Sequence, residues 1–181
     1  YLERLDDPAA AEPWARRAAA HPAHQRRARA LLLEVLEHRG RWGELTSELE
    51  RDVVTEPSAD AALALARARI RAGELAPAIA TLETARERHP RRGDLLEALI
   101  DACRAAGEKA RLRSLLLEAL ETAGEPARLA DLAAEIGQLE LGSFENPGAA
   151  VGWYRRALED RPDHLPAREG LVEELRRLAR A

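Results

Sequence analysis

Apolar residues recur along this chain three or four positions apart, and glycine or proline separates the runs. Across 58–72, for example, the apolar positions include Leu65, Ala66 and Ile70, and Gly73 follows as a helix C-cap. Such spacing places the apolar side chains on one face of a helix, with the charged residues opposite. The same pattern predicts helices over 24–39, 42–54, 58–72, 75–88, 92–106, 109–123, 126–141, 147–160 and 164–180.

The pattern also repeats along the chain. A small residue, a large apolar residue, a second small residue and then Pro or Gly return about every 34 residues, for example at Ala78, Leu82, Ala85 and Pro90. The Pro or Gly position recurs at intervals of 33, 34 and 38 residues. A fixed period of this size is typical of stacked helix pairs, each of which contacts its neighbours. We therefore expect an all-α solenoid of antiparallel helical hairpins that presents a surface to its partners.

The residues of these positions resemble the tetratricopeptide repeat (TPR) family. The clearest match is Ala150, Tyr154, Ala157 and Pro162, within the sequence GWYRRALEDRPDH. The family has small residues at the first and third of these positions because the two helices cross closely there. The resemblance covers residues 24–181, although the first helices lack the family's usual Trp and Gly-Tyr. The 38-residue unit that contains the match is also similar to a Sel1-like repeat.

The resemblance implies a right-handed superhelix formed by a single TPR-like domain over 1–181. At its start, Pro8 and Pro13 lie within one helix length. Since an interior proline costs about 3 kcal/mol, we expect the first helix to begin near Pro13. The expected domain plan is a partial leading repeat at 1–23, repeats at 24–58, 59–92, 93–126 and 127–164, and a terminal capping or half-repeat helix at 165–181.

Composition narrows the class of protein. Aromatic residues make up only 3% of the chain, and the abundant Ala, Leu, Glu and Arg favour helices. The net charge of −4 disfavours a nucleic-acid partner. No apolar run is long enough for a membrane span or a signal peptide, so we expect no membrane partner and favour a cytoplasmic location.

Arginine replaces lysine almost throughout, which suggests a GC-rich, bacterial genome. Because the chain begins at Tyr1 and has no Met, we expect it to be a segment of a longer protein.

Few residues are candidates for catalysis or for binding a cofactor. The five histidines are scattered, with no Cys or carboxylate cluster to complete a metal site. Cys103 lies on an apolar helix face, where it is more typical of a small hydrophobic residue than of a nucleophile. Trp42 and Trp153 lie outside the repeating positions, where they either fill hairpin joints or anchor a partner. We therefore predict a protein that is not an enzyme and that has no cofactor or metal.

In the TPR family the first helix of each hairpin lines a concave groove, so its polar residues are the candidate site. Five carboxylates on neighbouring first helices predict a negative groove that accepts a basic or mixed-charge peptide. The alternative is an ordinary solvated helix face with ion pairs. The basic clamp for acidic chaperone tails is missing. The candidate residues are Arg67, Arg71, Asp94, Glu97, Asp101, Arg104, Arg128, Asp131 and Glu135.

These observations favour a protein–protein interaction scaffold that docks a peptide or protein segment in its groove. Two alternatives remain open from the sequence. The chain could be a regulatory or sensor segment that controls a catalytic domain elsewhere, or a structural spacer. Flanking sequence would separate them, because a catalytic motif there would favour regulation.

Overall fold

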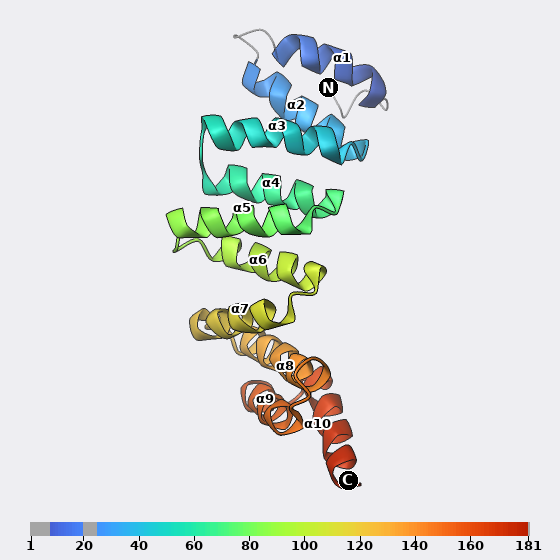
Figure 1. Cartoon of the computed structure of the whole chain (residues 1–181), viewed down its shortest axis with the longest axis vertical. Coiled ribbons are helices and arrows are strands. Elements are labelled where there is room, and N and C mark those ends of the chain that lie inside the picture. Colours follow the sequence, from blue (N-terminus) through green and yellow to red (C-terminus); the bar gives the residue numbers. More distant parts are fainter. Residues whose placement is uncertain (1–7, 20–24, 181) are drawn as a thin grey trace. The chain divides into compact units, whose positions relative to one another are not determined.

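The computed structural model describes residues 8–19 and 25–180, which contain ten α-helices and no strand (Figure 1). The prediction of an all-α chain of helical hairpins is therefore confirmed. The helix boundaries lie within one or two residues of those predicted from residue 24 onward. The helices are α1 Pro8–Ala19, α2 Gln25–His38, α3 Trp42–Thr55, α4 Ala59–Ala72, α5 Leu75–Arg88, α6 Gly93–Ala106, α7 Lys109–Thr122, α8 Pro126–Gly142, α9 Pro147–Asp160 and α10 Leu165–Leu178.

The start of the first helix differs from the prediction. Helix α1 begins at Pro8, and Pro13 lies inside it. The missing N–H of Pro13 removes one backbone hydrogen bond, but neighbouring contacts hold the helix together. Ala15 is buried in the core, and Glu12 binds Arg39 and Arg41 of the next hairpin joint. Tertiary contacts therefore outweigh the local cost of the proline.

Polar side chains cap the starts of some helices, and glycine ends others. The Ser58 hydroxyl accepts a hydrogen bond from the Ala61 N–H at 3.1 Å, which caps the start of α4. Gly73 ends the same helix in a left-handed conformation with φ of +81°. Asn146 caps α9 by accepting from the Ala149 N–H at 3.2 Å. These local signals fix the length of each hairpin.

The chain forms two compact units, residues 1–98 and 99–181, with the boundary inside α6. In the first unit, α1 packs on α2, α2 on α3, α3 on α4 and α4 on α5. Figure 1 shows α3, α4 and α5 side by side in sequence order. Large aliphatic side chains fill the core, among them Leu32, Leu36, Leu45 and Leu49. Each hairpin thus buries its apolar face against the next.

In the second unit, α7 packs on α8, α8 on α9, and α10 on both α8 and α9. Its core contains Ala130, Ala150, Ala157 and the ring of Tyr154, all almost fully buried. Ala150, Tyr154 and Ala157 are the small and large positions of the repeat. The small side chains allow the helices to approach closely.

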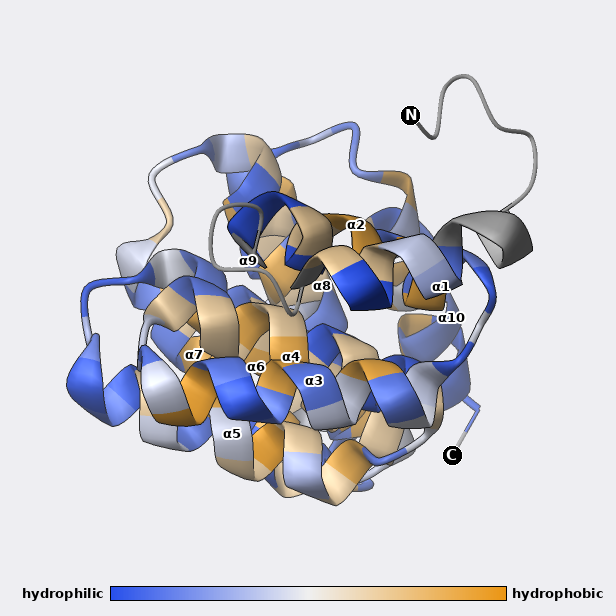
Figure 2. Ribbon diagram, turned by 90° about the horizontal axis from the view of Figure 1, so that it is seen from above, coloured by the Kyte–Doolittle hydropathy of each residue, from blue (hydrophilic) through white to orange (hydrophobic). Residues whose placement is uncertain are grey.

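Individual helices carry hydrophilic residues on one side and hydrophobic residues on the other, as α3 shows in Figure 2. This amphipathic pattern matches packing on one face only. Within the described ranges, no helix combines the length and the apolar character that crossing a membrane requires.

Candidate partner-binding surface

The nine candidate residues lie on the first helices of the hairpins, α4, α6 and α8, and we call them the first-helix surface. Arg67 and Arg71 project from α4 and are exposed. Asp94 and Glu97 are exposed on the first part of α6. These four belong to the first unit. The other five belong to the second unit: Asp101, Arg104, Arg128, Asp131 and Glu135.

In the first unit, one arginine joins the carboxylates of two first helices. The Arg92 Nη2 lies 2.7 Å from Oδ1 of Asp60 on α4 and 2.6 Å from Oδ2 of Asp94 on α6. The hydrogen bond from Arg92 holds the pKa of the Asp94 carboxyl below its ordinary value. Asp94 therefore stays ionised but is largely neutralised by its neighbour. Arg92 is not among the predicted residues, although the helix predicted over 92–106 includes it.

In the second unit, Arg104 likewise joins the carboxylates of two first helices. Its Nε and Nη2 donate to the two carboxylate oxygens of Glu135 on α8, at 2.8 and 3.0 Å. Its Nη1 donates to Asp101, one turn earlier on α6. Arg104, Asp101 and Glu135 thus lie together on one surface, as the repeat spacing predicts. Two parallel hydrogen bonds to Glu135 also fix the orientation of the guanidinium.

Asp131 has a partner that the sequence pattern missed. Its Oδ1 lies 3.0 Å from Nε2 of His164, a ring that is only 5% exposed. The His164 Nδ1 accepts the N–H of Ala167 at 3.2 Å and so caps α10. Because Nδ1 accepts, Nε2 carries the proton and donates to Asp131. The capping position of His164 could have been found from the Pro166 that follows it.

Three carboxylates of the first-helix surface are therefore paired with arginine: Asp94 with Arg92, and Asp101 and Glu135 with Arg104. Exposed pairs of this kind contribute about 0–1 kcal/mol each to stability. These pairs therefore add little to the stability of the fold.

Three buried carboxylates lie outside this surface, and the sequence analysis missed them. Glu140 is 2% exposed and binds Arg113, which also lies over the Phe144 ring, 5.6 Å from its centre. Glu174 is 1% exposed and binds Arg177 one turn later. Glu12 is the third. Glu12 and Glu140 join neighbouring elements, whereas Glu174 and its partner Arg177 lie on the same helix. No local signal distinguishes the three residues from solvated Glu residues.

The remaining candidates for chemistry are structural. Cys103 is buried, and burial, with a smaller contribution from the Glu108 charge, raises the pKa of its thiol to about 11. Little thiolate forms at neutral pH, so Cys103 is a poor nucleophile. Trp42 and Trp153 are partly buried and pack against the two cores. Among the residues that the structure describes, no group of three His, Cys, Asp or Glu side chains could hold a metal ion.

No protein-family model matches the sequence, and no curated protein matches it. Solved structures do. The chain superposes on YrrB, described as "a TPR protein with an unusual peptide-binding site", with a TM-score of 0.65 and 16% identity, covering 93% of this chain and 85% of that one. TTC0263, a TPR protein of Thermus thermophilus, matches with a TM-score of 0.51 and 21% identity, over 96% of this chain and 93% of that one.

A third match is a tetratricopeptide repeat protein from Parabacteroides merdae, with a TM-score of 0.52 and 17% identity. It covers 96% of this chain and 67% of that one. At these identities the likeness concerns the fold alone. The resemblance to TPR proteins that the sequence indicates is thereby confirmed at the level of the fold.

Proposed function

From the TPR fold of this chain, we propose that it is a protein–protein interaction scaffold and that its first-helix surface docks a basic or mixed-charge peptide. The observation that carries the proposal is the placement of Arg104 against both Asp101 and Glu135. Two consecutive first helices thus offer their charged groups side by side, in positions that an extended ligand can reach.

The charges of the second unit favour a ligand with Lys or Arg. Among the candidate residues there, three are carboxylates and two are arginines, Arg104 and Arg128. The side chains of Asp101 and Asp131 are more than half exposed. A basic side chain can therefore approach them without desolvating a buried charge, and it gains a faster encounter from the complementary field.

The candidate residues of the first unit carry a different mixture of charges. Arg67 and Arg71 of α4 are exposed, whereas Arg92 joins Asp60 to Asp94. A ligand that binds the second unit meets both its carboxylates and the arginines Arg104 and Arg128. We therefore expect a segment of mixed charge to bind better than a uniformly basic one. The peptide-binding site described for YrrB belongs to that protein, and it makes a peptide ligand a reasonable class to test here.

Binding of a fluorescein-labelled peptide panel, measured by polarisation, tests the proposal. The panel holds short peptides with Lys and Arg, their mixed-charge versions and acidic counterparts. A variant with Glu97→Gln, Asp101→Asn and Asp131→Asn removes three charges but keeps the shapes of the side chains. We expect it to weaken binding of the basic and mixed peptides roughly tenfold, because each exposed pair is worth up to about 1 kcal/mol.

The matched control is Glu87→Gln, Glu121→Gln and Glu159→Gln, which removes the same charge from exposed positions of the second helices α5, α7 and α9. It should leave binding unchanged, and added salt should weaken binding to the unmodified protein. Equal losses in both variants would indicate only a general charge effect. Unchanged binding in the first variant would reject the first-helix surface as the site.

A further inference from the structure

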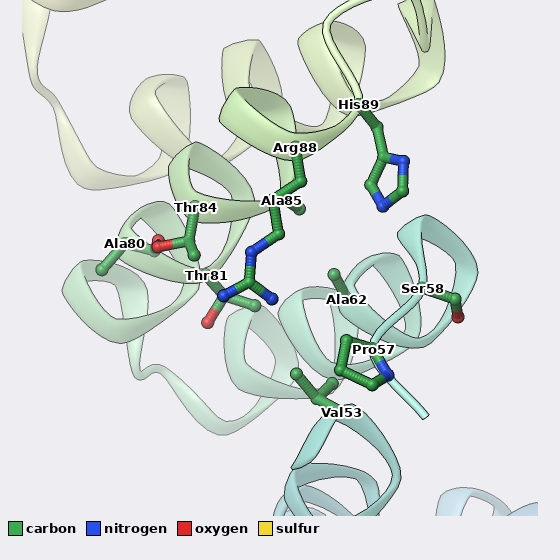
Figure 3. Close-up of a pocket in the computed structure, with 10 residues that line it drawn as sticks. All are labelled: Val53, Pro57, Ser58, Ala62, Ala80, Thr81, Thr84, Ala85, Arg88 and His89. Atoms are coloured by element: carbon green, nitrogen blue, oxygen red, sulfur yellow. The ribbon is translucent and has the colours of Figure 1, made fainter. Parts of the chain in front are cut away.

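A pocket of about 300 Å³ lies on the first unit, over the start of α4 and the exposed side of α5 (Figure 3). Its walls come from the end of α3, the connection at 57–58, α4 and α5. The pocket lies mainly between second helices, so it is distinct from the first-helix surface. The lining residues are Val53, Pro57, Ser58, Ala62, Ala80, Thr81, Thr84, Ala85, Arg88 and His89.

The floor of the pocket is apolar, because its polar groups are already engaged. The Thr81 hydroxyl donates to the Pro77 carbonyl at 2.8 Å, and the Thr84 hydroxyl donates to the Ala80 carbonyl at 3.0 Å. The Ser58 hydroxyl caps α4. These hydroxyls turn toward backbone, which leaves methyl and methylene groups facing the pocket. A ligand group seated there would be recognised by apolar contact.

The charge of the pocket is positive. Its lining contains an arginine and a histidine but no carboxylate. Figure 3 shows the guanidinium of Arg88 extended over the pocket between Thr81 and Ala62, and the ring of His89 turned toward the start of α4. Arg88 forms no ion pair or hydrogen bond with the residues that the structure describes, although many arginines of this chain have carboxylate partners. Asp60, nearby on α4, is held by Arg92.

We propose that this pocket docks an acidic-aliphatic segment of a partner protein. An aliphatic side chain of the segment fills the space beside Val53, Pro57 and Ala62. An adjacent Asp or Glu carboxylate accepts two hydrogen bonds from the Arg88 guanidinium, whose planar fork matches a carboxylate. A volume near the lower end of about 300–1,000 Å³ for ligand pockets suits a short segment. The site prefers charge opposite to that expected for the first-helix surface, so the two can be tested independently.

The test uses isotope-labelled full chain and a panel of short peptides in which Leu, Ile or Val alternates with Asp or Glu. We expect backbone amide shifts in the NMR spectrum at Ala62, Thr84 and Ala85 on addition of these peptides. Arg88→Ala should weaken binding roughly tenfold, since a charge-assisted hydrogen bond is lost. Arg88→Lys should weaken it less, because the charge remains but the fork is lost.

Arg91→Ala is the matched control, since Arg91 is an exposed arginine three residues away that does not line the pocket. It should bind the peptides like the unmodified chain. Peptides with Ser in place of the aliphatic residues, or with Asn and Gln in place of the acidic ones, should lose binding. Circular dichroism confirms that the variants fold, and Arg88→Ala should still bind the basic peptides of the first-helix surface.

Three outcomes would overturn the proposal. Arg88→Ala could bind the acidic-aliphatic peptides as tightly as the unmodified chain. The Ser-substituted peptides could bind equally well, which would indicate charge attraction without a pocket. The panel could also fail to bind at all, or shift only amides outside the pocket.

Discussion

Tyr154 of α9 lies between two glycines, Gly137 of α8 and Gly170 of α10. A Cβ at Gly170 would lie 2.6 Å from Cζ of the ring, and one at Gly137 would lie 2.8 Å from Cε1. The ring is only 2% exposed, so it cannot move away from one glycine without approaching the other. These two residues therefore set how closely α8 and α10 approach the ring.

Gly170→Ala should destabilise the second unit by about 1–3 kcal/mol, because the added methyl group overpacks a filled site. Thermal and urea denaturation measure the loss. Gly152→Ala is the matched control on α9, where no atom lies within 4 Å of the added Cβ. It should be neutral or stabilising by up to about 1 kcal/mol, from helix propensity alone.

A second substitution separates crowding from other causes. Tyr154→Leu should restore part of the stability lost in Gly170→Ala, since the smaller side chain makes room for the methyl group. If the double variant is as unstable as the sum of the single changes, the two positions do not interact and the overpacking explanation is wrong.

At the scale of elements, the start of helix α10 is held by His164, and the helix also packs on α8 and α9. His164 caps the helix and binds Asp131 of α8, whereas the side chains of Leu165, Val172 and Leu175 are exposed. Glu174 is the buried charged residue of α10, and its carboxylate accepts a hydrogen bond from the Arg177 guanidinium. The histidine thus joins the last helix to the first helix of the preceding hairpin.

His164→Ala should destabilise the protein by roughly 1 kcal/mol and loosen α10 first, because the helix loses its cap. Hydrogen exchange of the α10 amides, together with thermal denaturation, measures this effect. His164→Asn keeps a capping oxygen for the Ala167 N–H and should retain most of the stability. Equal losses in both variants would show that the contact with Asp131, rather than the cap, is what matters.

At the scale of the whole molecule, the chain has two units, each with its own core. Leu36 is fully buried in the first unit, and Ile136 is fully buried in the second. In a stack of repeats each helix pair contacts its neighbours only, so a local loss of stability spreads weakly along the chain.

Leu36→Ala should therefore increase hydrogen exchange in α1–α5 much more than in α7–α10. Ile136→Ala should do the reverse, and each substitution should cost about 2–5 kcal/mol locally. Hydrogen exchange followed by mass spectrometry resolves both regions in one experiment. Uniform acceleration along the chain in both variants would show instead that the chain unfolds as one cooperative unit.

Most helix boundaries could be predicted from the sequence, because caps and apolar spacing act over a few residues. Ser58, Gly73 and the small positions such as Ala157 are local signals of this kind. Pro13 misled the prediction because its cost is local, whereas the contacts of Glu12 and Ala15 that offset it come from distant residues. That the candidate residues bind a partner stays a prediction. The exposure of Asp101 and Asp131 follows from helical spacing, but their partners do not.

The sequence by itself determined the helical hairpins, their period and which face of each helix is buried, because these depend on residue type and on spacing within one turn or one repeat. Only the tertiary structure decided which charges are paired. Arg92 reaches Asp60, Arg104 reaches Glu135 and His164 reaches Asp131 across about 30 residues of sequence. Such contacts depend on the distance between neighbouring helices, which the packing of many side chains sets together.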